Sequence, residues 1–180
     1  MEDKLLIWKF KCGSTEALCR IYDKYKSHLL KISTALLNDK SVAEDVVHDV
    51  VVMLARSAGS IKVSGNLKSF LATCVANRAR NVNGHSRLRA AGDLEQVGSL
   101  ISRSPRPEQW IVYNEELDRL NEALSQLPYP QREVITLHLH GGIKFRKIAQ
   151  MQETSINTVQ SRYRYGLDKL RSLLNCEVEK

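Results

Sequence analysis

The chain has 180 residues, of which 27 are Lys or Arg and 20 are Asp or Glu, so its formal net charge is +7 at pH 7. This length accommodates one ordinary domain or two small helical ones, and the basic surplus favours a polyanionic partner. The chain contains no uninterrupted run of 18 apolar residues, which argues against membrane insertion and for a protein of the cytoplasm.

Candidate metal ligands and nucleophiles form no recognisable site in the sequence. The four cysteines lie far apart and include no CxxC pair, which argues for reduced thiols and against a zinc site or a disulfide framework. They are Cys12, Cys19, Cys74 and Cys176. His138 and His140 would project from opposite sides of a helix, which argues against a metal site. The chain also lacks a nucleophile elbow and a GxxxxGK[ST] loop, so we expect no cofactor and no catalytic activity.

Sparse glycine and proline, together with apolar residues at three-and-four spacing, predict an all-α protein. The first helix is expected to begin near Ser14 and to end at Asn38. A second helix is expected to begin at Ser41, because Glu44 three residues later completes a capping box, and to run to about Arg56.

A third helix is predicted from Leu67 to about Asn83, after a loop over residues 57–66 and before Gly84. At 100° per residue, one face of this helix is apolar and the opposite face is polar and basic. Arg78 projects from the apolar face. It therefore either lies at the rim of the core or pairs with an acidic residue.

Charge divides the chain into blocks. Residues 60–92 contain six basic and no acidic residues, residues 93–130 contain three basic and seven acidic ones, and residues 131–172 contain eight basic and three acidic ones. Each basic block is a candidate phosphate-contacting surface, because Lys and Arg gain affinity for nucleic acids by releasing counterions. The alternative is two solvated helix faces, which charged runs usually are.

Residues 91–107 mix Gly, Ser, Arg and Pro with weak apolar periodicity, which is the composition of a flexible linker. This linker would separate two small helical domains, at residues 1–90 and 108–180, that move independently. A further helix is expected after Pro107 and must end before Pro128. Its outer face is acidic and repels DNA, so we expect this helix to pack within the protein.

Three short helices are predicted at the C-terminal end, over residues 131–140, 145–152 and 156–174. The last two, joined by a tight turn, would form a helix-turn-helix whose second helix reads base edges in the major groove. That helix is expected to bury its apolar side, beginning with Ile156 and Val159, and to expose residue types that contact bases and phosphates. The candidate DNA contacts are Ser155, Asn157, Thr158, Gln160, Ser161, Arg162 and Arg164.

The order and spacing of residues at this end resemble region 4 of the sigma-70 family. The resemblance is carried by Leu127-Pro128, Arg132-Glu133-Val134, Ile148-Ala149, Ser155 and Thr158-Val159-Gln160-Ser161-Arg162. It implies that the helix from Asn157 onward reads the −35 element of promoters. The chain departs from the family pattern at Glu153, where a left-handed Gly is common, and at Gln152, where an apolar residue is common.

The N-terminal part is similar to region 2 of the same family. Residues 43–50 resemble the segment that docks on the β′ coiled coil of RNA polymerase, and residues 66–81 resemble the segment that contacts and opens the −10 element. With both regions and no region 3, the chain resembles the extracytoplasmic function group. The implied polymerase-docking residues are Glu44, Asp45, His48 and Asp49. The implied −10 contacts are Lys62, Asn66, Lys68, Phe70, Asn77, Arg80 and Asn81.

The resemblance implies a transcription factor that acts through core RNA polymerase, by way of its β′ coiled coil and β subunit, and through promoter DNA. An anti-sigma factor would be a further partner. Residues 83–86 replace the usual arginine run, so fewer phosphate contacts are expected. Two other classes fit the motifs less completely: a stand-alone helix-turn-helix regulator that never contacts polymerase, and a protein-interaction adaptor that does not bind DNA.

Overall fold

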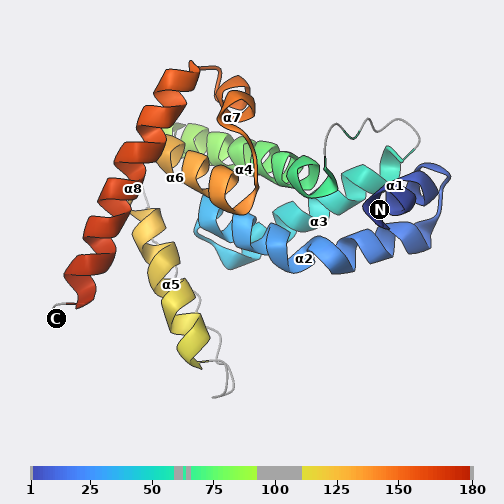
Figure 1. Ribbon diagram of the computed structural model, residues 1–180, viewed down its shortest axis with the longest axis horizontal. Coiled ribbons are helices and arrows are strands. Elements are labelled where there is room, and N and C mark those ends of the chain that lie inside the picture. The colour runs from blue at the N-terminus through green and yellow to red at the C-terminus, as the bar shows by residue number, and fades with distance from the viewer. Residues whose placement is uncertain (1, 59–62, 64–65, 93–110, 179–180) are drawn as a thin grey trace.

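The computed structural model describes the backbone of residues 2–58, 63, 66–92 and 111–178, and the side chains of residues 2–58, 63, 66–84 and 118–175. Within these residues every regular element is a helix, which confirms the all-α prediction (Figure 1). The elements are α1 (Glu2–Lys11), α2 (Thr15–Leu37), α3 (Lys40–Arg56), α4 (Leu67–Gly92), α5 (Ile111–Ser125), α6 (Tyr129–Ile135), the π-helical turn η2 (Thr136–His140), α7 (Phe145–Met151) and α8 (Ile156–Val178).

The helices form two groups that meet at one end of a bundle (Figure 1). We call residues 2–92 the N-terminal half and residues 111–178 the C-terminal half. Helices α2, α3 and α4 lie alongside one another, with α1 at the far end of the bundle and α5 to α8 at the near end. No helix among the described residues is long and apolar enough to cross a membrane.

Helix α1 was not predicted from the sequence, because it is short and has little amphipathic periodicity. It is held against α2 by the buried side chains of Leu6 and Phe10. Its first turn is also tied down by polar contacts: the Asp3 carboxylate accepts hydrogen bonds from Lys24 Nζ at 2.8 Å and from the Tyr25 hydroxyl at 2.7 Å. Tertiary contacts therefore stabilise a helix that its own sequence marks weakly.

Helix α2 begins and ends where the sequence predicts, and α3 begins slightly earlier. Ser14 caps α2 by accepting a hydrogen bond from the Ala17 amide, and left-handed Asn38 ends that helix. The predicted capping box at Ser41 is wrong. Asp39 has the extended backbone of a cap and accepts a hydrogen bond from the Val42 amide at 3.0 Å, which places Ser41 inside the first turn.

Helix α4 does not end at Gly84 as predicted but continues to Gly92. A glycine ends a helix when it takes a left-handed conformation, and Gly84 has no positive φ angle. Within a helix it costs only about 1 kcal/mol relative to alanine, which the flanking turns tolerate. At the other end Asn66 caps α4, because its side-chain oxygen accepts a hydrogen bond from the Ser69 amide at 2.7 Å.

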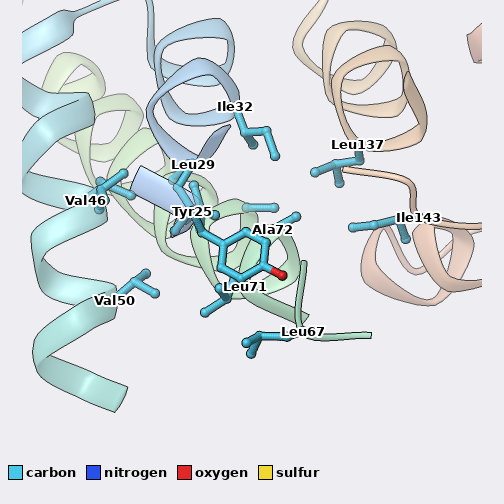
Figure 2. Close-up of a cluster of buried hydrophobic side chains, with 14 of the residues drawn as sticks. Tyr25, Leu29, Ile32, Val46, Val50, Leu67, Leu71, Ala72, Leu137 and Ile143 are labelled. Carbon is cyan, nitrogen blue, oxygen red and sulfur yellow. The ribbon is translucent and has the colours of Figure 1, made fainter. Parts of the chain in front are cut away.

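One apolar core runs through both halves of the molecule. Figure 2 shows Leu137 and Ile143, from the C-terminal half, facing the side chains of α2 and α4 that form the core of the N-terminal half. A second, smaller cluster joins Ala35 of α2 to apolar residues of α5, α6 and α8. The expectation of independently moving domains therefore differs from the observed packing. The predicted linker falls largely on residues 93–110, which lie outside the described residues.

The C-terminal half is built around close helix contacts that the printed sequence only partly announces. Gly142, with φ of 62°, turns the chain after η2, as the Gly141-Gly142 pair predicts. Gly166 is required for another reason: a Cβ atom there would lie 2.8 Å from Ile135 Cδ1, so α6 and α8 can meet only at a glycine. Ile156, which we expected to be buried, is 41% exposed, because α8 packs on the core only from Val159 onward.

Candidate functional site

The predicted polymerase-docking residues lie together on the exposed face of α3. Glu44, Asp45, His48 and Asp49 are all exposed, whereas the intervening apolar residues of the helix are buried in the core. Asp49 also identifies the acidic partner that the sequence left open for Arg78. Its carboxylate accepts hydrogen bonds from Arg78 Nε at 2.9 Å and Nη2 at 2.6 Å.

The predicted −10 contacts are spread along α4 and do not form one cluster. Asn66 and Lys68 lie exposed at the start of the helix, and Asn77 and Asn81 lie exposed further along it. Fifteen residues of helix at about 1.5 Å per residue separate Asn66 from Asn81 by roughly 22 Å. Phe70 is half-buried against the core. Lys62 lies outside the described residues.

Arg80, another predicted −10 contact, faces the C-terminal half. Its Nη2 atom donates a hydrogen bond to Glu133 Oε1 at 2.6 Å, and the Arg80 side chain is 33% exposed. The same guanidinium reaches the side-chain oxygen of Asn77 at 3.3 Å. This arginine therefore already has a carboxylate partner in the free chain, which a helical wheel could not reveal.

Helices α7 and α8 form the predicted helix-turn-helix. Glu153 has φ of 51°, the left-handed conformation that the motif needs at this position. The Thr154 amide bonds to the Ala149 carbonyl at 3.0 Å, and the Glu153 amide to the Gln150 carbonyl at 3.4 Å, which is the hydrogen-bond pattern of a Schellman motif. Ser155 then caps α8 by accepting a hydrogen bond from the Thr158 amide. The turn therefore forms although glycine is absent.

The predicted −35 contacts divide into exposed and engaged side chains. Asn157, Gln160 and Arg164 are exposed on α8, opposite the buried Val159. Ser155 and Thr158 share a hydroxyl contact of 2.9 Å in the cap of the helix. Ser161 is half-buried, as is Arg162.

Gln152 explains how the engaged residues are held. Its amide oxygen accepts a hydrogen bond from Arg162 Nη1 at 2.7 Å. Its amide nitrogen donates to Glu133 Oε2 at 2.8 Å and to the Pro130 carbonyl at 3.1 Å. The position where an apolar residue is common therefore holds a polar bridge between α6 and α8, while Met151 packs against the core beside it.

Glu133 is the centre of this arrangement. It is 1% exposed and accepts hydrogen bonds from Arg80, Gln152 and the Tyr129 hydroxyl, the last at 3.3 Å. Burial raises the pKa of Tyr129, and the nearby Glu133 carboxylate adds to the effect, so this hydroxyl remains a donor. A groove of about 470 Å³ runs beside these residues, and Arg80, Glu133, Gln152 and Arg162 all line it.

Three exposed basic residues beside the helix-turn-helix were not among the predicted contacts. Lys144, Arg146 and Lys147 lie at the start of α7, the helix that crosses the DNA backbone in this motif. The high basic content of residues 131–172 was the signal that could have identified them. His138 has a structural surrounding instead: its ring stacks on Phe145 with centroids 4.1 Å apart.

Two family models match the chain, in the same order as the two halves. The model described as Sigma-70 region 2 matches residues 21–92, and the model described as Sigma-70, region 4 matches residues 117–170.

Curated relatives resemble the chain over most of its length. A protein named ECF RNA polymerase sigma factor SigK, from Mycolicibacterium vanbaalenii, is 28% identical over 163 residues, covering 88% of this chain and 82% of the relative. The protein of the same name from Mycobacterium tuberculosis is 26% identical over 165 residues, covering 89% of this chain and 85% of the relative.

Two solved structures share the fold. The sigma factor RpoE in complex with the anti-sigma factor NepR, from Bartonella quintana, superposes with a TM-score of 0.66 and 26% identity, covering 85% of this chain and 95% of that one. A structure of CnrH in complex with the cytosolic domain of CnrY has a TM-score of 0.68 and 19% identity, covering 97% of each chain.

Proposed function

Because the chain belongs to the sigma-70 family of RNA polymerase sigma factors, in its extracytoplasmic function group, we propose that it binds core RNA polymerase and directs initiation at specific promoters. The observation that carries the proposal is the presence of both sigma regions, in order, in a chain that presents an exposed helix-turn-helix. Polymerase supplies the nucleotide chemistry, and this chain supplies recognition and strand opening without catalysis of its own.

Residues 1–90 act as region 2 and dock on polymerase through α3. Glu44, Asp45, His48 and Asp49 support this role because they share one exposed face over a well-packed core. Charged side chains on such a face are desolvated cheaply and steer association with a basic partner surface. The β′ coiled coil of polymerase is the proposed partner.

The same region opens the −10 element. Unstacking a base costs a few kcal/mol, which contacts to the exposed single strand can offset. Lys68 is exposed at the start of α4 and would hold phosphates, together with Lys62, while Asn66 and Phe70 would contact the extruded base. Asn77, Arg80 and Asn81 would contact the duplex beside it.

Residues 108–180 act as region 4 and read the −35 element, and residues 91–107 link the two regions. Asn157 and Gln160 are exposed near the start of α8, where recognition helices contact base edges. Gln and Asn bond adenine in two places, whereas Arg162, Arg164 and the hydroxyls of α8 suit phosphates. The exposed basic residues at the start of α7 support the same orientation on DNA.

The regulation and location of the protein follow from the same assignment. RpoE and CnrH were each solved with a partner, NepR and CnrY. We extend this to the present chain, for which we propose control by an anti-sigma factor in the cytoplasm.

Transcription in vitro tests the function directly. Core polymerase is assayed on a promoter library with and without this chain, and with the chain carrying Gln160→Ala. We expect initiation from a defined set of promoters only when the chain is present, and an altered set with the variant. DNA binding without any association with core polymerase would instead support a stand-alone helix-turn-helix regulator.

A further inference from the structure

We infer that the contact chain Arg80–Glu133–Gln152–Arg162 is an intramolecular lock, which keeps arginines of both halves from DNA while the halves are packed together. The inference rests on the proposed function, because it takes Arg80 and Arg162 as DNA contacts. The four residues come from α4, α6, the turn after α7, and α8, so the lock spans the junction between the halves.

The carboxylate of Glu133 takes the place that a DNA phosphate would take. It accepts a charge-assisted hydrogen bond of 2.6 Å from Arg80, the same type of bond that an arginine donates to a phosphate oxygen. Glu133 also fixes Gln152 at 2.8 Å, and Gln152 in turn binds Arg162 at 2.7 Å. A phosphate must therefore displace bonds that already exist inside a largely desolvated site.

The shape of the junction excludes DNA as well. Arg80 and Arg162 line the same groove of about 470 Å³, which is the size of a site for a small molecule. A DNA duplex, whose major groove alone is about 12 Å wide, cannot enter a space of that size. The two arginines can contact separate promoter elements only after α4 has moved away from α6 and α8.

Other contacts hold the two halves in this arrangement. Arg132 Nη2 donates a hydrogen bond of 3.2 Å to the Leu36 carbonyl in the buried part of the junction. The Ser69 hydroxyl donates to the Gly141 carbonyl at 3.2 Å. Leu137 fills the shared core between α2, α4 and the C-terminal half. The lock thus acts on a packed interface, and its release exposes both arginines together.

The closed form can be fixed by an engineered disulfide. A Cβ atom at Gly142 would lie 3.7 Å from Ser69 Oγ, close to the spacing of a cross-link across the junction. The Ser69→Cys, Gly142→Cys variant is made in a chain with Cys12 and Cys19 replaced by serine. Binding of a short fluorescent duplex is measured for the oxidised protein and for the same sample after reduction. The lock predicts a Kd about tenfold higher, or more, for the oxidised form.

A charge-matched pair of variants tests Glu133 itself. Glu133→Gln removes the charge that holds Arg80, whereas Glu153→Gln removes an equal charge from an exposed residue that lines the same groove. The lock predicts that duplex affinity of the full chain rises about three- to tenfold more with Glu133→Gln than with Glu153→Gln. Hydrogen exchange at Leu137 should rise in parallel with the affinity.

The outcomes separate the lock from the proposed function. Equal affinity of the oxidised and reduced forms, failure of the disulfide to form, or equal effects of the two glutamine variants would overturn the lock. Failure of the reduced protein and of the unmodified chain to support transcription by core polymerase would overturn the proposed function instead. A lock that holds in duplex binding, with normal transcription after reduction, supports both.

Discussion

Two charged regions of this molecule look alike in the sequence and differ in the structure. On α3, Glu44 and Asp45 project into water, and even the Asp49–Arg78 pair is about half exposed on each side. At the junction of the halves, the Glu133 side chain is 2% exposed and is held by several donors. A charge in water is free to meet a partner at little cost to the fold. A buried charge must first leave the partners that hold it, so it couples binding to a conformational change.

The sharpest contrast between an internal junction and a solvent-facing surface comes from two leucines of η2. Leu137 is fully buried in the core shared by both halves, whereas Leu139 is 55% exposed. We expect Leu137→Ala to lower the free energy of unfolding by about 2–5 kcal/mol, because it leaves a cavity. Leu139→Ala should change it by about 0.5 kcal/mol or less. Urea denaturation followed by circular dichroism measures both, and similar losses in the two variants would contradict the shared core.

The exposed face of α3 should behave in the opposite way, with a large effect on binding and a small one on stability. Asp45→Lys together with Asp49→Lys should weaken association with core polymerase about ten- to a hundredfold, or about 1.4–2.8 kcal/mol. The control is Glu16→Lys with Asp23→Lys on α2, which reverses two exposed charges and also breaks an exposed ion pair. Binding of both proteins to immobilised polymerase is compared. The docking assignment is wrong if the α3 variant binds normally while folded.

Helix α8 contains both kinds of side chain, which should separate in DNA binding. Gln160 is exposed, and Gln160→Ala should cost about 1–3 kcal/mol on the preferred −35 site and relax preference at one position. Arg162→Ala should weaken all sites alike and reduce the salt slope by about 1. Gln150→Ala, on the exposed side of α7, is the control and should change neither quantity. Unchanged upstream binding in both α8 variants would remove this helix from the groove.

The smallest effect concerns the pH dependence of the packed state. Burial lowers the pKa of His28 to about 4, with added repulsion from Lys68, His140 and Lys31, and burial likewise lowers the pKa of His140. Because the unfolded chain then binds protons that the folded chain does not, stability should be complete above about pH 6.5 and fall as the pH drops from there toward 4.

His28→Gln isolates this contribution. We expect it to flatten the decrease in Tm between pH 7 and pH 5 by a few degrees. The control is His48→Gln on the exposed face of α3, which should leave the slope unchanged. An identical pH slope in all three proteins would show that His28 is not protonated at a cost to folding. Differential scanning calorimetry provides the comparison.

Local sequence signals were reliable where the cause of the structure is local. Ser14 and Asn38 mark the ends of α2 because capping depends on a few neighbouring atoms. The helix-turn-helix could be predicted for the same reason, since its turn and its polar face lie within one short segment. Signals failed where distant residues decide: α1 is held by contacts with α2, and Gly84 stays helical within a long packed helix.

The sequence by itself determined the helical class, the two sigma regions and the residue types on α3 and α8, because periodicity, caps and motif spacing are written along the chain. Only the tertiary structure decided that Arg78 pairs with Asp49 and that Gln152 links Glu133 to Arg162. It also decided that the core of one half continues into the other. Partners separated by 29 or 53 residues, as in Arg78–Asp49 and Arg80–Glu133, leave no periodic trace, since their distance depends on how whole helices pack.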